Sequence, residues 1–243
     1  MKVDTSFAMY SDTPKGKDPD KDSSTLRRYH KYLWSKSLPS GQELHLSDKQ
    51  PGCYLYFNTG SVEMALASDS IIHTYSKWKR KSMADIIAQV NVHEIESFYN
   101  AGSTIGGYVL FPCKTGTGQS VNQKRGMTSA ISDRFDLTLE CIRLWYLQGF
   151  DFENPLADVL EKNRVFFELF ESFKGYIQFF LLDDLVDESY SKVKFWIPFD
   201  GFGRRPAVPV NVPEYRAYRD NAMAFVSARN SRIERICSEK ISM

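Results

Sequence analysis

The sequence has no long hydrophobic run, and its beginning carries no apolar segment of the kind found in signal peptides. Its longest apolar stretch runs from Tyr176 to Leu182, is interrupted by Gln178, and is far shorter than the roughly 18 residues that a membrane-spanning helix requires. The first residues, Met1-Lys2-Val3-Asp4, include charged side chains, which are foreign to the apolar core of a signal peptide. These absences exclude a membrane-spanning helix and predict a cytoplasmic protein.

Closely spaced metal-binding residues are also missing. The chain has four cysteines that lie far apart and form no C-x-x-C pair, Cys53, Cys113, Cys141 and Cys237. Free thiols are typical of cytosolic proteins. The four histidines form neither H-x-x-x-H nor H-E-x-x-H, the spacings that place two imidazoles on one metal. The sequence therefore predicts no metal site and identifies no cofactor.

An excess of charge of one sign is absent as well. Lys and Arg number 31 against 30 Asp and Glu, for a formal net charge of +1. Proteins that bind nucleic acid through phosphate contacts usually carry a strong basic excess. Only local stretches, Lys77–Lys81 around Trp78 and the Arg27–Arg28 pair, combine cations with aromatic rings. A nucleic-acid-associated stress or phage-defence protein is therefore an alternative hypothesis, as is a non-enzymatic interaction protein or homodimer.

Aromatic residues are abundant, with 17 Phe and 13 Tyr, and they indicate a large core because each ring buries roughly 150–250 Å². We predict a single α+β domain over residues 1–243, with an exposed polar loop at 11–24 and a small mixed or antiparallel sheet packed against several helices. The expected strands are Cys53–Phe57, Val62–Leu66, Ile105–Phe111 and Val193–Phe199.

Helical spacing of apolar residues predicts helices from Ser24 or Thr25 to Ser35, from about Thr128 to Gly149, and from Asn154-Pro155 to a break at Gly175. Tyr176–Val186 is apolar around nearly its whole circumference and predicts a central buried helix. A last amphipathic helix is expected from Glu214 to about Ser238. The phenylalanines at 166–180 are expected to belong to the core.

Five segments, read in order, resemble an uncharacterised bacterial family, a domain of unknown function. They are Lys17–Lys36 (KDPDKDSSTLRRYHKYLWSK), Thr104–Pro112 (TIGGYVLFP), Asp133–Tyr146 (DRFDLTLECIRLWY), Phe173–Val186 (FKGYIQFFLLDDLV) and Lys192–Asp200 (KVKFWIPFD). The resemblance covers nearly the whole chain. It implies a bacterial, cytoplasmic protein of one domain, and it implies no activity, cofactor or catalytic residue.

The loop Cys113–Gly126 (CKTGTGQSVNQKRG) is the main candidate site, because it joins an expected strand to an expected helix. Glycines let backbone N–H groups point at an anion, and a helix N-terminus adds partial positive charge. The residues expected to bind a small anionic or phosphorylated ligand are Lys114, Gly116, Gly118, Asn122, Lys124, Arg125 and Arg134. The loop matches neither Walker A nor G-x-G-x-x-G, since Val121 occupies the third glycine position. A solvated surface loop is the competing interpretation.

Three carboxylates, Asp133, Asp136 and Glu140, follow i, i+3, i+7 spacing and are expected on one helix face. In a pocket they could hold a divalent metal or serve acid–base chemistry, or they could simply pair with Arg134 and Arg143 on the surface. Whether the protein binds its ligand as an enzyme or only as a binding protein is left open by the sequence, as are its catalytic residues and oligomeric state.

Overall fold

The computed structural model describes residues 2–48, 54–58, 62–72, 81–113 and 120–242. Within these ranges, helices alternate with two small antiparallel sheets, so the predicted α+β class is confirmed. None of the described helices is both long and apolar enough to cross a bilayer.

The larger sheet has the strand order β3-β4-β5-β6 and is antiparallel throughout. Its strands are β3 (Leu46–Asp48), β4 (Leu55–Asn58), β5 (Glu63–Ser70) and β6 (Tyr108–Pro112), and a separate ribbon pairs β1 (Lys36–Ser37) with β2 (Glu43–Leu44). Three of the expected strands are confirmed, although Ile105–Gly107 forms the 3-10 helix η2 rather than the start of β6. Every residue of β6 is buried.

The expected strand Val193–Phe199 is wrong. Only an isolated bridge between Val186 and Val193 forms there. The backbone N–H of Trp196 donates to the buried carboxylate of Asp136 instead of to a neighbouring strand, at 3.0 Å. The alternating pattern of this segment therefore reflects packing against helices and not sheet pairing.

The N-terminal loop is less exposed than predicted. Residues 14–18 are exposed, but α1 (Pro19–Asp22) buries Asp20, and Ser23 is also buried. Ser23 caps α2 (Ser24–Trp34), since its hydroxyl accepts a hydrogen bond from the N–H of Leu26 and donates to Asp12. A serine in this position satisfies one of the unpaired N–H groups at a helix start, so the expected boundary of this helix holds to within two residues.

The middle of the chain folds into five short or medium helices. They are α6 (Val121–Met127), α7 (Phe135–Gln148), α8 (Ala157–Lys162), α9 (Arg164–Glu168) and α10 (Phe173–Phe180). The expected helix at 128–149 thus begins only at Phe135, and the expected loop at 113–126 already contains α6, whose start is fixed by a capping box between Ser120 and Gln123.

The expected central helix Tyr176–Val186 is shorter than predicted and begins earlier. Leu181 adopts a left-handed conformation (φ 58°) that ends α10, and the 3-10 helix η3 (Asp183–Leu185) follows. Gly175 does not break a helix but lies within α10. A Cβ atom there would lie 2.1 Å from the carbonyl oxygen of Phe170 and 3.2 Å from Cγ of Pro39, so only glycine allows this close approach.

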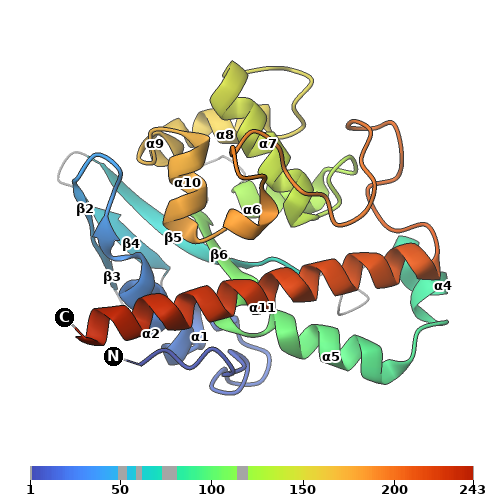
Figure 1. Cartoon of the computed structure of the whole chain (residues 1–243), viewed down its shortest axis with the longest axis horizontal. Coiled ribbons are helices and arrows are strands. Elements are labelled where there is room, and N and C mark those ends of the chain that lie inside the picture. The colour runs from blue at the N-terminus through green and yellow to red at the C-terminus, as the bar shows by residue number, and fades with distance from the viewer. Residues whose placement is uncertain (1, 49–53, 59–61, 73–80, 114–119, 243) are drawn as a thin grey trace.

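The long helix α11 (Val212–Ser242) crosses the whole molecule in Figure 1, below α7–α10. Along its length it contacts η2, η3 and two earlier helices, α4 (Ala84–Ile87) and α5 (Val92–Gly102), and a further 3-10 helix, η1 (Lys81–Met83), precedes α4. The N-terminal segment and the end of α11 lie at the same side of the molecule (Figure 1). The helix therefore ties the N-terminal region to the helical half of the fold.

Closely packed aromatic rings fill the core between α2 and α10. Phe166, Phe167, Phe170 and Tyr176 are fully buried. Phe170 and Tyr176 meet edge to face at 5.4 Å, and Trp34 of α2 lies 5.3 Å from Phe180. Such geometries are favourable for aromatic pairs, and the prediction that these phenylalanines are core residues is confirmed.

Candidate functional site

The predicted anion-binding loop is described only in part. Lys114, Gly116 and Gly118 lie outside the described residues. Asn122 and Lys124 are half-buried on α6, and Lys124 lies in the last turn of this helix. Cys113 at the start of the loop is buried, and burial together with the nearby Asp20 carboxylate raises the pKa of its thiol to about 12. At neutral pH this cysteine is a thiol and a poor nucleophile.

Arg125 belongs to a buried ion-pair cluster. Its side chain is 0% exposed, and its guanidinium donates to Asp69 at 2.5 Å, to Thr138 at 3.0 Å and to the carbonyl oxygen of Asp133 at 2.7 Å. Burial disfavours the charged guanidinium, yet the carboxylates of Asp133 and Asp69 outweigh it and raise the pKa of Arg125. This arginine is a permanent cation whose charge is matched by two aspartates inside the protein.

Arg134 is buried in a second, separate cluster. It forms an ion pair with Asp136, and it donates to the carbonyl oxygens of Ala207 at 3.0 Å and Ile197 at 3.3 Å. This arrangement clamps the irregular segment before α11 onto the start of α7. Neither arginine therefore presents its guanidinium to solvent in this structure, and anion binding at the 113–126 loop stays a prediction.

The three carboxylates expected on one helix face do not share a site. Asp133 precedes α7 and has a left-handed backbone (φ 66°). Asp136 pairs with Arg134, and both oxygens of Glu140 accept hydrogen bonds from Arg143 at 2.7 Å. Among the described residues no group of His, Cys, Asp and Glu is arranged to hold a metal ion.

A buried serine–histidine contact, invisible in the sequence, resembles a catalytic dyad. Nε2 of His30 lies 2.9 Å from the hydroxyl of Ser68, and Nδ1 accepts a hydrogen bond from the indole N–H of Trp34 at 2.9 Å. An indole can only donate, so Nδ1 is the unprotonated nitrogen and Nε2 carries the hydrogen.

This tautomer makes His30 a donor toward Ser68 and not a base. Burial, with Arg229 and Arg27 nearby, lowers the pKa of His30 to about 3, which keeps the ring neutral near pH 7. The contact joins α2 to β5 and has no nucleophile-activating geometry.

The basic stretches considered for nucleic acid are only partly exposed. Arg27 is buried, where it pairs with Asp48 and donates to the carbonyl oxygen of Asp20, and residues 77–80 lie outside the described ranges. A shallow hollow of about 560 Å³ is lined by Arg28, Lys31, Tyr32, Ser35, His45, Leu46, Ser47 and Asp48. The ion pair between Lys31 and Asp48 neutralises part of its charge.

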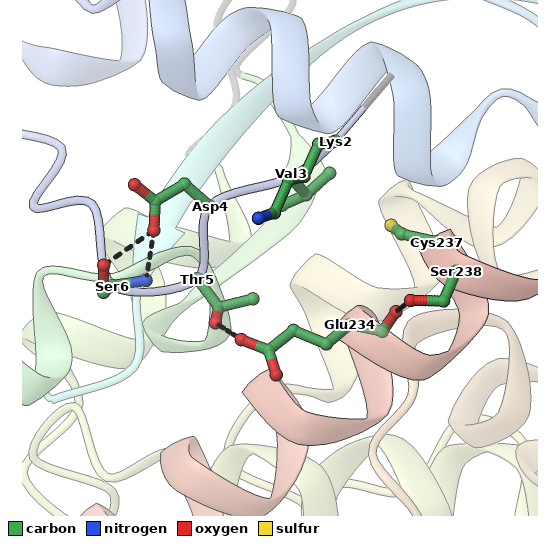
Figure 2. A pocket seen from close by; sticks show the side chains of 8 residues that line it. All are labelled: Lys2, Val3, Asp4, Thr5, Ser6, Glu234, Cys237 and Ser238. Atoms are coloured by element: carbon green, nitrogen blue, oxygen red, sulfur yellow. Dashed lines mark hydrogen bonds between the residues drawn. The ribbon is translucent and has the colours of Figure 1, made fainter. Parts of the chain in front are cut away.

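A hollow of about 570 Å³ lies between the N-terminal segment and the last turns of α11. Its lining comprises Lys2, Val3, Asp4, Thr5, Ser6, Glu234, Cys237 and Ser238, which Figure 2 shows from close by. The hydroxyl of Thr5 donates to Glu234 across this gap, and that of Ser6 donates to Asp4 at 2.7 Å. Two carboxylates against one lysine make this hollow unsuited to an anion.

One side of α10 and its cap residue Ser172 border a hollow of opposite character, with a volume of about 400 Å³. It is lined by Lys36, Ser37, Leu38, Pro39, Ser172, Lys174, Gly175, Gln178 and Phe179. We call it the α10 pocket. Its lining holds two lysines, two serines and one amide, and no carboxylate. Its volume falls within the range of small-molecule sites.

Lys36 is held in place at the wall of the α10 pocket. Its ammonium donates to the carbonyl oxygen of Phe179 at 2.6 Å and lies 4.4 Å from the centre of the Phe179 ring. Contacts between a cation and an aromatic face are favourable. Lys174 is exposed, with its ammonium 5.1 Å from the Tyr190 ring.

The start of α10 also borders this pocket. The side chain of Ser172 caps α10 by accepting from the N–H of Gly175 at 3.1 Å. The N–H groups of Phe173 and Lys174, in the first turn, have no carbonyl partner within a helix. No sequence motif marks this pocket, because Lys36 and Lys174 are brought together from distant segments by the packing at Gly175.

Comparison with known proteins places the chain in a family without an assigned activity. No curated protein matches it. No solved structure matches it. A family model described as "Family of unknown function (DUF6994)" matches residues 3–233. The chain therefore belongs to this family of unknown function.

Proposed function

We propose that the protein binds a small anionic, phosphorylated ligand in the α10 pocket. The observation that carries this proposal is the composition of the lining, which holds two lysines and the first turn of a helix and has no acidic residue. Helix N-termini favour anions through their dipole and their unpaired N–H groups. Two cations favour a phosphate dianion over a single carboxylate.

The rest of the ligand would contact the apolar wall of this pocket, formed by Leu38, Pro39 and Phe179. The hydroxyls of Ser37 and Ser172 and the amide of Gln178 stand beside it. Ser37 donates to Glu43, which lies outside the lining. A compound that joins a phosphate to a compact, partly apolar group, such as a sugar phosphate or a nucleotide, fits this combination.

The 113–126 loop is the competing location for the same chemistry, with Asn122 and Lys124 as its described polar residues. A cytoplasmic location and a bacterial source, which the sequence predicts, would supply phosphorylated metabolites of this kind.

Nucleic-acid binding is the second candidate function. It is favoured by the hollow that contains Arg28, Tyr32 and His45, and binding there should weaken steeply with salt.

A thermal-shift screen followed by calorimetry tests the proposal, with inorganic phosphate, sugar phosphates, nucleotides and acetate as probes. At least one phosphorylated probe should raise the melting temperature, and acetate should not. Lys174→Gln should weaken that probe's binding about tenfold or more, as expected for loss of a charged hydrogen-bond donor. Lys162→Gln, which removes an exposed lysine of α8, serves as the matched control.

One other variant separates the two locations. Lys124→Gln should leave binding unchanged if the ligand occupies the α10 pocket and weaken it if the ligand occupies the 113–126 loop. If no phosphorylated probe binds, or if Lys174→Gln and Lys162→Gln behave alike, the α10 pocket is not the site. Arg28→Gln together with a salt titration of single-stranded DNA binding tests the second candidate.

A further inference from the structure

A second hollow along α11 adjoins the one in Figure 2. The second hollow has a volume of about 350 Å³ and is lined by Thr5, Ser6, Ala101, Thr104, Met223, Val226, Ser227, Asn230, Ser231 and Glu234. Thr5, Ser6 and Glu234 line both, so the two hollows adjoin. We call them together the terminal groove. It runs between the N-terminal segment, the end of α5 and one face of α11.

Four hydroxyl groups of the terminal groove donate their hydrogens to the protein. Thr5 donates to Glu234 and Ser6 to Asp4. Thr104 and Ser231 donate to backbone carbonyl oxygens, at 2.8 and 3.2 Å. A hydroxyl has one hydrogen and two lone pairs. What these four side chains offer a ligand is therefore acceptor capacity and not donors.

The amide of the groove is engaged in the same way. Oδ1 of Asn230 accepts from the N–H of Gly106 at 2.8 Å, and its Nδ2 donates to Thr104 at 2.9 Å. The terminal groove thus selects for a ligand that brings hydrogen-bond donors of its own.

Charge points to the same class of ligand. Hydrogen bonds from the hydroxyl and N–H of Ser6 lower the pKa of Asp4, so this exposed carboxyl is ionised at neutral pH. Glu234 adds a second carboxylate, and Lys2 is the only cation among the described lining residues.

The floor of the groove is apolar between these charges. Val3 and Val226 are buried, and Ala101 and Met223 complete the floor. Methylene groups are stabilised on such a surface while charged ends stay at its rim. A chain of methylenes that carries ammonium groups matches both features.

We propose that the terminal groove binds an aliphatic diamine or polyamine, with ammonium groups near Asp4 and Glu234 and methylenes over Val3. The ligand's N–H donors fill the acceptors that the hydroxyls leave open. This site is separate from the α10 pocket, and its ligand has the opposite charge.

Calorimetric titration with the diamine putrescine tests the proposal, with butanediol as a neutral ligand of similar shape. Putrescine should bind and butanediol should not. Glu234→Gln and Asp4→Asn each keep an oxygen acceptor for Thr5 or Ser6 and remove a charge, and each should weaken putrescine binding about tenfold or more. Lys2→Gln removes the competing cation and should strengthen binding severalfold. Circular dichroism checks that each variant is folded.

Glu239→Gln is the matched control, because Glu239 is exposed on α11 outside the lining. It should leave putrescine affinity unchanged, as should Lys174→Gln in the α10 pocket. The proposal is overturned if putrescine gives no heat and no amide chemical-shift change at millimolar concentration, if butanediol binds equally well, or if Glu239→Gln weakens binding as much as Glu234→Gln. The result for phosphorylated probes is independent of each of these outcomes.

Discussion

At the scale of single residues, the interior of this protein holds polar groups that most cores exclude. Asp20 on α1 is 6% exposed, and its carboxylate accepts the backbone N–H of Ser68 at 2.7 Å. Burial raises the pKa of Asp20 to about 7, although the Ser68 hydrogen bond opposes the shift. Ionising this side chain therefore costs more free energy in the folded protein than in the unfolded chain.

Asp20→Asn should stabilise the protein above pH 7 and have little effect near pH 4. The folded-state pKa of Asp20 lies above its ordinary value of 3.8, so the folded wild-type protein loses stability as pH rises from about 4 to 7. Asparagine keeps the oxygen that accepts from Ser68 and removes this loss. We expect a gain on the order of 1–3 kcal/mol at pH 8, measured by urea unfolding of both proteins at pH 5 and pH 8.

His30 makes stability depend on pH in the opposite direction, so the variant has to be compared with the wild type at each pH. Its folded-state pKa lies below its ordinary value, so its contribution to stability falls as pH drops through about 6.5 toward 3. His30 is present in both proteins and cancels in the difference. An equal gain from Asp20→Asn at pH 5 and pH 8 would contradict the assigned protonation of Asp20.

At the scale of elements, Arg229 joins three of them without a carboxylate. Its guanidinium is fully buried and donates to the carbonyl oxygens of Phe180, Gly106 and Tyr108 at 2.6–3.1 Å. Phe180 ends α10, so the cation also meets the negative end of that helix dipole. Burial lowers the pKa of Arg229, and among the described residues no acid forms an ion pair with it.

Arg229→Lys should destabilise the protein by about 2–4 kcal/mol, because a lysine cannot satisfy several carbonyl groups in different directions and leaves some of them unpaired. Urea unfolding measures the difference. Arg235→Lys, an exposed position on the same helix, should change stability by less than about 0.5 kcal/mol. Similar effects at both positions would mean that the carbonyl contacts of Arg229 contribute nothing specific.

The sequence predicts the kinds of elements better than their limits. Ser23, Asn58 and Gly149 mark ends that local chemistry determines, and these ends lie within a residue or two of the prediction. The failures depend on distant partners. The pattern at 193–199 has strand-like alternation, but Asp136 takes the backbone N–H of Trp196, and nothing near Trp196 in sequence indicates that contact.

Candidate sites were harder to predict for the same reason. By residue type, Arg125 and Arg134 suit an anion site. Only the tertiary structure shows that Asp69 pairs with Arg125 and that Asp136 pairs with Arg134. Lys36 and Lys174 meet in the α10 pocket from 138 positions apart in the chain (174 − 36), with no motif at either position. Single-sequence patterns report neighbours along the chain, whereas these sites are made by neighbours in space.

At the scale of the whole molecule, the described parts of the fold are connected by α11 and by two buried arginines. These are Arg229, near the end of α10, and Arg134, at the start of α7. The buried apolar residues form one continuous cluster from Val3 to Cys237. We therefore predict one cooperative unfolding transition, as for a single domain. Far-UV circular dichroism and tryptophan fluorescence should give the same midpoint in urea, whereas two midpoints would show that the chain contains separately folding units.

Trp34 is a core residue whose fluorescence should respond to binding in the α10 pocket. Its indole ring lies 5.2 Å from the ammonium of Lys36 and 5.6 Å from the guanidinium carbon of Arg229, and the side chain is 1% exposed. An excited indole responds to the local electric field, and these two cations contribute to that field. If an anion binds beside Lys36 as proposed, it should change the field at Trp34, and the protein's own tryptophan fluorescence should then report occupancy without a dye.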